Sequence, residues 1–346
     1  MPKFAIRVDA SRAVGMGHLS RARAFAQYLA ERQLEFTFFC GREGCEILKK
    51  WGFPEKKIMR SDDDSIFDQS FTHALIDINY KDSQVSTEAL AYQLASRGIH
   101  PIIIDSMPPD NVILGGAHEM LTSITLVTPY LDAARFCSEP PKNVDWLAGP
   151  NYTILGAEFS SVEDWQLLIS KKSMLVVCGG SDPNGLSVRI ARLIHNKMKA
   201  PVTFVIGPLF SKDIEAELIA ISQSNKLISL KWGLTNLASE MLCHSHVVGQ
   251  VGLTRYEGAA LGRYGIYLAP DNRYREYYEN FSNRGLAEIY FEGSVTSRRA
   301  FFERLMVELD SSILPAVNRE GLMAVKRNGI HQILSRALSQ TDSGLI

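Results

Sequence analysis

The 346-residue sequence predicts an α/β protein with two doubly wound parallel sheets. Strand-like and helix-like segments alternate through both halves of the chain, as parallel sheets with crossover helices require. Segment 101–105 is a continuously apolar strand pattern, which is typical of parallel strands covered on both faces. The chain is also longer than the roughly 250–300 residues at which a single core stops growing, so we expect two domains.

Composition excludes several classes of protein. The chain is 46% hydrophobic and 22% charged, which is ordinary for a soluble globular protein. Its net charge is −1 and its basic residues are scattered, so we expect no nucleic-acid partner. No apolar run approaches the ~20 residues of a membrane span, and the N-terminus lacks a signal-peptide pattern. We therefore expect a cytoplasmic protein without a membrane span.

Cysteine and histidine patterns favour neither disulfides nor metals. The five cysteines are an odd number and form no C-x-x-C pair, so we expect no disulfide framework or structural zinc. His244 and His246 suggest a metal site, but their apolar neighbourhood offers no further ligands. Residues 62–64 are three aspartates, which indicate a solvated turn rather than a metal cluster. We predict no metal and no cofactor.

The first strand leads into the most informative stretch. Residues 4–8 predict a buried strand, and apolar residues at helical spacing between 22 and 29 predict a helix that starts near His18. The turn between them is where an open α/β sheet presents its ligand-binding edge. Gly15 and Gly17 allow close backbone approach to a ligand.

His18 is a candidate general base. The helix start offers free N–H groups and a partial positive charge, which favour an anion such as phosphate. The same dipole disfavours the imidazolium, so the ring stays neutral and able to accept a proton. Arg21 lies one turn later on roughly the same face. The alternative is a loop histidine that only caps the turn.

Further elements follow in order along both halves. Strands are expected at 35–40, 74–77, 101–105, 174–178, 201–206, 226–230 and from 247, and helices at 84–96, after 185, from Thr254 and within 296–340. After strand 174–178, a Gly-Gly-Ser-Asp turn offers backbone donors for phosphate or forms a hinge. Alternatively, Asp182 or Asn184 caps the next helix. Thr254 and Glu257 fit a capping box, in which Thr254 caps its helix.

The pattern Arg-x-Asp-x-Ser-x-x-x-Gly-x-Gly-His-x-x-Arg, from Arg7 to Arg21, resembles the opening of the nucleotide-sugar hydrolase of pseudaminic acid biosynthesis. That enzyme family removes UDP from UDP-2,4-diacetamido-2,4,6-trideoxy-β-L-altrose. The resemblance implies a GT-B-like fold, in which two Rossmann-like doubly wound domains face each other across a cleft. It places an N-terminal domain at 1–160, a nucleotide-binding domain at 172–325, and a C-terminal helix and tail at 326–346 that packs back on the first domain.

The resemblance also implies roles for individual residues. His18 would be the catalytic base. Residues that would bind the sugar substrate are Asp9, Ser11, Gly15, Gly17, Arg21, Asp77, Tyr80, Asp105 and Asn272. Residues that would bind the nucleotide are Gly179, Gly180, Ser181, Gly252, Leu253, Thr254 and Glu257, where Glu257 would hold the ribose hydroxyls.

The chain departs from the family pattern mainly in the nucleotide half. Val251 and Leu253 replace a glycine and a serine of the phosphate-binding turn, and Gly156 stands where the family tends to have an arginine. Residues 263–264 are Arg-Tyr in place of an apolar-Pro pair, and 271–273 replace an Asn-Gln pair. This unevenness indicates conserved cleavage chemistry with altered leaving-group recognition, or a divergent paralogue.

The sequence predicts hydrolysis of a UDP-activated deoxyamino sugar with inversion at the anomeric carbon. His18 would deprotonate a water that attacks the face opposite the departing UDP. One alternative is a GT-B glycosyltransferase that uses a UDP-sugar donor, and another is a non-catalytic nucleotide-sugar-binding paralogue. The expected partner is the small-molecule nucleotide sugar. The sequence leaves the oligomeric state open, with a monomer favoured.

Overall fold

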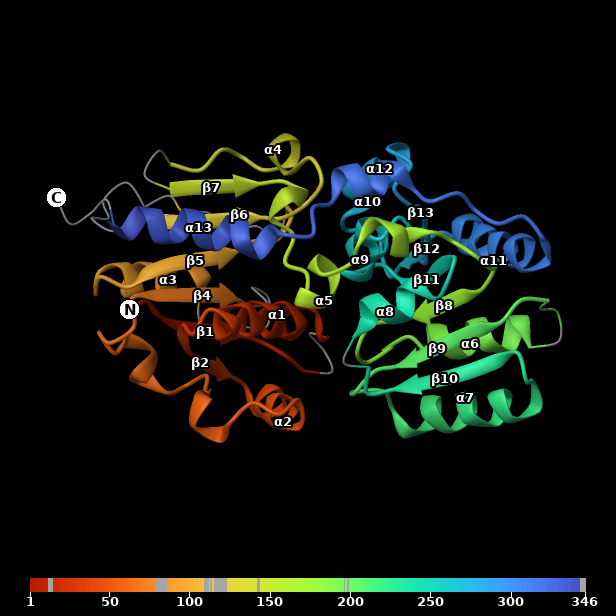
Figure 1. Cartoon of the computed structure of the whole chain (residues 1–346), viewed down its shortest axis with the longest axis horizontal. Coiled ribbons are helices and arrows are strands. Elements are labelled where there is room, and N and C mark those ends of the chain that lie inside the picture. The colour runs from red at the N-terminus through yellow and green to blue at the C-terminus, as the bar shows by residue number, and fades with distance from the viewer. Residues whose placement is uncertain are drawn as a thin grey trace. The chain divides into compact units, whose positions relative to one another are not determined.

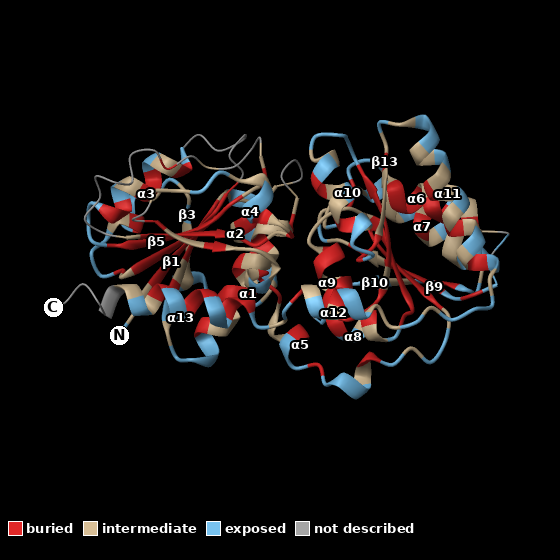
Figure 2. Ribbon diagram, turned by 90° about the horizontal axis from the view of Figure 1, so that it is seen from above, coloured by how far each residue is buried: buried red, intermediate tan, exposed pale blue. Residues whose placement is uncertain are grey.

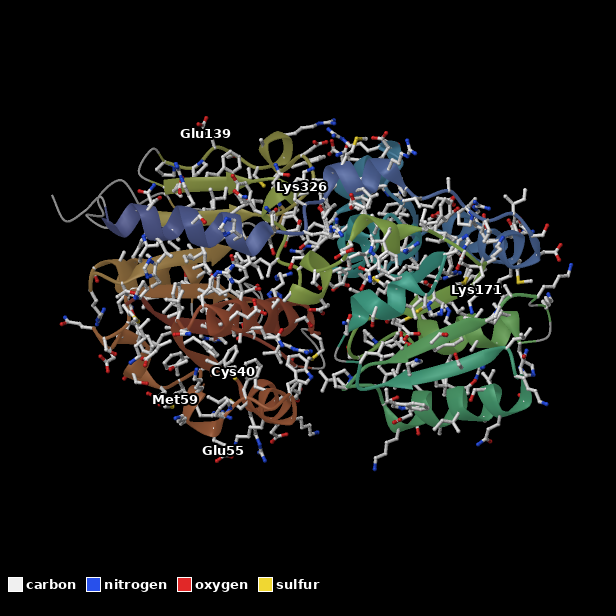
Figure 3. All side chains as sticks on the ribbon, viewed as in Figure 1. Cys40, Glu55, Met59, Glu139, Lys171 and Lys326 are labelled. Atoms are coloured by element: carbon white, nitrogen blue, oxygen red, sulfur yellow. The ribbon has the colours of Figure 1, made fainter. Side chains whose placement is uncertain are left out.

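The computed structural model describes residues 1–11, 15–78, 86–108, 112, 114, 123–141, 144–195, 197, 199–234 and 236–342. The chain forms two compact units (Figure 1): unit 1 comprises Met1–Ala157 and Lys326–Ile346, and unit 2 comprises Glu158–Val325. The returning segment of unit 1 begins at Lys326, which is labelled in Figure 3. Each unit carries its own parallel sheet.

The sheet of unit 1 has seven strands in the order β3-β2-β1-β4-β5-β6-β7. They are β1 (Lys3–Val8), β2 (Glu35–Cys40), β3 (Ile58–Arg60), β4 (His73–Asp77), β5 (His100–Ile104), β6 (Ile124–Thr128) and β7 (Val144–Ala148). The strand order reverses between β1 and β4, where Val8 is the register partner of Asp77. Ligands of open α/β sheets bind at such a switch point, outside the carboxyl ends of the strands.

Helices cover both faces of this sheet. They are α1 (Gly17–Glu31), α2 (Arg42–Lys50), α3 (Thr87–Ala95), α4 (Ala133–Phe136) and α13 (Gly329–Asp342), whereas the short helix α5 (Ala157–Ser160) lies at the boundary between the units. Figure 2 shows α1 and α13 on one face and α3 on the other. The rings of Phe25 on α1 and Phe4 on β1 meet edge-on, with centroids 6.2 Å apart. The central strands β4, β5 and β6 are buried on both faces, as expected for parallel strands covered by helices on each side.

Helix α13 packs on unit 1 beside β5 and the 3₁₀ turn at Pro150–Tyr152 (Figure 1). Its His331 Nδ1 lies 2.9 Å from the Tyr28 hydroxyl, and Arg336 Nε donates to Asp145 at 2.8 Å. A Cβ on Gly329 would lie 2.1 Å from the carbonyl oxygen of Thr153, so the helix start fits only as glycine. These contacts join the end of the chain to its first domain.

The sheet of unit 2 has six strands in the order β10-β9-β8-β11-β12-β13. They are β8 (Met174–Val177), β9 (Val202–Ile206), β10 (Ile228–Trp232), β11 (His246–Gln250), β12 (Tyr264–Ala269) and β13 (Glu288–Phe291). The order reverses between β8 and β11, so the loops after these two strands share the switch point. At Gly249, a Cβ would lie 1.9 Å from the carbonyl oxygen of Val177, which requires glycine.

The helices of unit 2 are α6 (Leu186–Ile194), α7 (Lys212–Ser224), α8 (Leu237–Leu242), α9 (Thr254–Ala260), α10 (Arg275–Asn283), α11 (Val295–Asp310) and α12 (Arg319–Ala324). Apolar side chains of α6, α7 and α11 form one core cluster with the sheet, including Ile190, Leu218 and Phe301. Within the described part of the chain, no helix combines the length and apolar character that crossing a bilayer would need.

Candidate active site

The switch point of unit 1 brings the loop after β1 beside the end of β4. The amide of Asp9 donates to the Asp77 carbonyl at 3.4 Å. The loop closes on itself where the amide of Gly15 donates to the Ser11 carbonyl at 2.8 Å. Gly15 has φ +84°, in the left-handed region that favours glycine. Met16 occupies the cap position of α1, and its side chain does not cap the helix.

His18, Arg21 and Asp77 form a hydrogen-bonded cluster at this point. The Nδ1 atom of His18 lies 2.6 Å from Asp77 Oδ1. Arg21 binds the same carboxylate in a bidentate way, with Nε donating to Oδ2 at 2.8 Å and Nη2 donating to Oδ1 at 2.7 Å. Asp77 is fully buried, whereas the His18 side chain is 20% accessible. The cluster therefore exposes the imidazole and buries its acid.

The charge on Asp77 fixes the tautomer of His18. Burial alone raises the pKa of the Asp77 carboxyl, but the positive charge of Arg21 and the hydrogen bonds from Arg21 and His18 outweigh it and lower the pKa to about 2. The ionised carboxylate can only accept, so Nδ1 of His18 carries the proton in their bond. Arg21 Nη2, 3.1 Å from Nδ1, is then a close neighbour that shares the acceptor Oδ1.

The opposite nitrogen of His18, Nε2, is the candidate proton acceptor. Among the residues that the structure describes, none hydrogen-bonds Nε2. A histidine with Nδ1 held by a carboxylate and Nε2 open has the geometry of a general base. The turn-capping alternative does not hold, because His18 lies inside α1 and its ring binds Asp77.

Several predicted substrate residues have partners within unit 1. We expected Asp77 and Arg21 to contact substrate, and the structure pairs them with each other. The Asp9 carboxylate accepts from Arg7 at 2.6 Å. Asp105, also buried, accepts from the amides of Ser106 and Val112 at 2.8 Å each, which shapes the loop after β5. Tyr80 lies outside the described residues.

In unit 2, the Gly-Gly-Ser-Asp turn follows β8. Gly179 has φ +74°, and the Gly180 carbonyl accepts from the amide of Leu209 at 2.9 Å. Asp182 is buried and caps α6 by accepting from the amides of Leu186 and Ser187 at 2.8 and 3.0 Å. Asp182 thus binds the first amides of α6, as the capping interpretation expected, although the cap position itself is Gly185. The turn from Gly179 to Ser181 lies at the carboxyl edge of β8.

The loop after β11 differs from the capping-box prediction. Helix α9 begins at Thr254, but its cap position is Leu253 and no side chain caps it. Thr254 is already helical, so the reciprocal bonds of a capping box with Glu257 do not form. Among the described residues, none hydrogen-bonds the amide N–H groups of Gly252, Leu253 and Thr254. They belong to the loop that follows β11, at the switch point of unit 2.

Glu257 lies one turn into α9 with a half-buried side chain. Burial, with a smaller effect from the negative charge of Glu158, raises the pKa of Glu257 to about 8. The carboxyl is therefore mostly protonated at neutral pH. Asn272, in the exposed turn after β12, accepts from Arg275 Nη2 at 3.0 Å.

His244 and His246 are engaged in structural hydrogen bonds. His246 Nε2 lies 3.1 Å from the Glu308 carboxylate, and His244 Nε2 lies 3.0 Å from the Thr203 hydroxyl. In the described part of the chain, His, Cys, Asp and Glu side chains form no group of three or more that would hold a metal.

The fold of this chain is shared with solved proteins. MurG of Acinetobacter baumannii superposes with a TM-score of 0.60 at 11% identity, over 98% of this chain and 100% of that protein. MnaA of S. aureus, solved with UDP, gives 0.58 at 12% identity over 100% and 98%. LpCGTa, also solved with UDP, gives 0.57 at 14% over 99% of each chain. The fold is thus GT-B-like, with two parallel-sheet Rossmann-like domains.

Sequence comparisons are less informative. An uncharacterized protein of Methanocaldococcus jannaschii is 24% identical over 286 residues, which make up 81% of this chain. The chain spans 58% of the length of that curated relative. No protein-family model matches the sequence.

Proposed function

We propose that this protein hydrolyses a UDP-activated 2,4-diacetamido-2,4,6-trideoxy sugar, as in pseudaminic acid biosynthesis, and releases UDP and the inverted free sugar. The observation that carries the proposal is the His18–Asp77 bond of 2.6 Å, which leaves Nε2 of His18 open at the switch point. The resemblance of the Arg7–Arg21 stretch to the hydrolase family supports the choice of reaction. UDP in the MnaA and LpCGTa structures supports the choice of nucleotide.

In this reaction His18 acts as general base toward water. The water gives its proton to Nε2 while its oxygen bonds to the anomeric carbon. The bond from that carbon to the UDP oxygen breaks, and UDP departs with the electron pair from the opposite face. Asp77, ionised and 2.6 Å away, stabilises the imidazolium that forms. A placed base of this kind contributes about 10²–10⁴-fold in rate.

Unit 2 would hold the leaving group. The amides of Gly252, Leu253 and Thr254, which bind none of the described residues, are suited to the oxygens of a diphosphate, and the turn at 179–181 offers further backbone groups. Glu257 would take the ribose hydroxyls. A diphosphate held by preorganised donors is a better leaving group, because its developing charge is already solvated.

A panel of UDP-, CMP- and dTDP-sugars tests the function. We expect free UDP from a UDP-diacetamido-trideoxy sugar without any added acceptor, and NMR of the fresh product should show the inverted anomer. The His331→Asn variant is the control for loss of a histidine in unit 1 and should release UDP like the parent. Its histidine also pairs with a neighbour, Tyr28, but lies on helix α13. Absence of nucleotide release from every sugar in the panel would contradict hydrolysis.

A glycosyltransferase is the second candidate, because an open Nε2 can deprotonate an acceptor hydroxyl as well as water. The two functions differ in their need for an acceptor. Release of UDP only when a sugar or lipid alcohol is added would identify the transferase.

Replacement of Glu257 by glutamine tests the ribose contact. We expect KM for the UDP-sugar to rise about 10-fold, since the ribose diol would favour the ionised form of the carboxyl on binding and donate to both of its oxygens, whereas an amide accepts through one oxygen only. Calorimetric unfolding supplies a second readout. The pKa of Glu257 is raised from 4.5 to about 8 in the folded chain. The free energy of unfolding of the parent is therefore highest below about pH 4.5, where this carboxyl is protonated in both states, and it falls as pH rises to 8.

Glu257→Gln should therefore gain stability relative to the parent between pH 5 and 8, by up to about 5 kcal/mol. The control is Glu279→Gln, an exposed glutamate paired with Arg275, which should change neither readout. An unaltered KM in Glu257→Gln would remove the ribose role.

A further inference from the structure

A buried cation lies directly behind the loop after β11. Arg255, the second residue of α9, is 5% exposed. The aromatic rings around its guanidinium carbon, with centroids at 4.7–5.7 Å, belong to Tyr256, Tyr277, Tyr278 and Phe281. Its Nη1 donates to the Gly252 carbonyl at 2.7 Å and its Nη2 to the Tyr277 hydroxyl at 3.2 Å. Its buried Nε has no hydrogen-bond partner among the described residues.

The positive charge of Arg255 is not neutralised locally. Its hydrogen bonds go to a carbonyl and a phenol, and no ion pair to a carboxylate occurs within the described residues. Burial raises the pKa of Tyr277 and of Tyr278, so both phenols stay neutral. The pKa of Glu257 is raised to about 8, so this acid is also mostly neutral at pH 7. The cluster therefore carries a net positive charge.

A buried charge without a counter-ion is costly, because water no longer solvates it. The faces of the aromatic rings return part of that energy through cation–π attraction. The rest of the desolvation cost is offset when an anion binds near the guanidinium, because the attraction between opposite charges is strong in a region of low dielectric. The guanidinium is thus better suited to a loaded anion site than to an empty one.

The bond from Arg255 also sets the direction of the loop amides. The C=O and N–H of a trans peptide point to opposite sides. Because the Gly252 carbonyl points at Arg255, the N–H of Leu253 points away from it. This is the middle one of the consecutive unpaired amides at Gly252, Leu253 and Thr254.

We propose that Arg255 is a positioning residue for the diphosphate of the nucleotide. Arg255 does not touch the ligand. It holds the Gly252–Leu253 peptide so that the N–H of Leu253 points toward the bound diphosphate. Its positive charge, on the other side of this peptide, attracts the negative charge of the diphosphate. The inference rests on the proposed nucleotide role of this loop. It also explains how a loop with Val251 and Leu253 can hold phosphate without the glycine and serine of the related family.

The test compares Arg255→Met with Arg263→Met. Arg263 is a matched control, because it is fully buried, donates to backbone carbonyls of Leu167 and Gln166 at 3.0 and 3.4 Å, and has an unpartnered Nε. It precedes β12, however, and so lies at the opposite edge of the sheet from the loop after β11. Dissociation constants are measured by NMR titration with UDP and with uridine, which lacks the phosphates.

We expect Arg255→Met to weaken UDP about 10- to 100-fold, the equivalent of losing one charged hydrogen bond, and to leave uridine within about 2-fold. Arg263→Met should alter neither constant. If Arg255→Met does not fold, Arg255→Lys is tested in its place. This variant keeps a positive charge but loses the planar guanidinium. We expect it to weaken UDP binding about 3- to 10-fold and to leave uridine binding unchanged.

Equal weakening of UDP and uridine, or an equal UDP loss in Arg263→Met, would show that Arg255 only supports the fold. If Arg255→Met shows the selective loss of UDP binding but the parent releases no UDP from any sugar, hydrolysis is refuted and the role of Arg255 is supported. A parent that binds neither UDP nor inorganic pyrophosphate would overturn both.

Discussion

The His18→Asn variant should bind the nucleotide sugar about as well as the parent and lose about two to four orders of magnitude in kcat, as removal of a general base does. Asparagine keeps a polar group near Asp77 but cannot accept a proton. KM should therefore change little, because the ring acts on the attacking water and not on the bound nucleotide. Steady-state release of UDP measures both constants.

The pH dependence of kcat provides an independent readout. The parent should slow as pH falls, because a protonated Nε2 cannot take a proton from water, and the residual activity of His18→Asn should lack this acidic limb. The His331→Asn control should keep both the rate and the limb. If His18→Asn retained most of the parent kcat, the ring would not be the base.

The fold was predictable because its signals are local. Buried parallel strands such as β5 are marked by continuous apolar runs, here Ile102–Ile104, and the apolar spacing between 22 and 29 marks α1. Strand β10 was placed two residues too early, at 226–230, because its pattern is largely exposed and gives no apolar boundary. Strands β6 and β7 follow a long connection without periodicity and were not predicted.

Individual contacts were harder to predict, because they join residues that are distant in sequence. The resemblance indicated Asp77 as a substrate residue, whereas the structure pairs it with His18, 59 positions away. Only the adjacent register of β1 and β4 brings the two together. The capping box failed for a related reason: the four-residue pattern is met by Thr254 and Glu257, but the chain enters α9 one residue earlier, at Leu253.

Arg255 shows the same limit in unit 2. The aromatic rings around its guanidinium include Tyr277, 22 positions away, and two further rings of α10, those of Tyr278 and Phe281. A run of tyrosines at 274, 277 and 278 is visible in the sequence, but the partner that they enclose is not.

The Asp77→Asn variant should lose about two to four orders of magnitude in kcat, comparable with the loss in His18→Asn. The carboxylate holds the proton on Nδ1 and stabilises the imidazolium, and a neutral amide does neither reliably. The variant should also lose about 3 kcal/mol of stability, because the largely buried Arg21 loses its bidentate ion pair with the Asp77 carboxylate. Urea denaturation measures the second effect.

The sign of the pH dependence follows from the depressed pKa. Asp77 titrates at about 2 in the folded chain and at 3.8 ordinarily, so its contribution is present above about pH 4 and is lost as pH falls toward 2. The stability gap between parent and Asp77→Asn should narrow over that interval. Asp145→Asn, which removes the partner of Arg336 on the edge strand β7, should leave kcat unchanged.

The double variant His18→Asn/Asp77→Asn separates catalysis from folding. If Asp77 acts through the imidazole, its removal costs little more kcat once His18 is gone, because residues that act as a unit are strongly non-additive. The loss of stability, by contrast, should remain in the double variant, since it arises from Arg21. If the two kcat losses multiplied instead, Asp77 would influence the reaction independently of His18, and the base would not depend on the buried carboxylate.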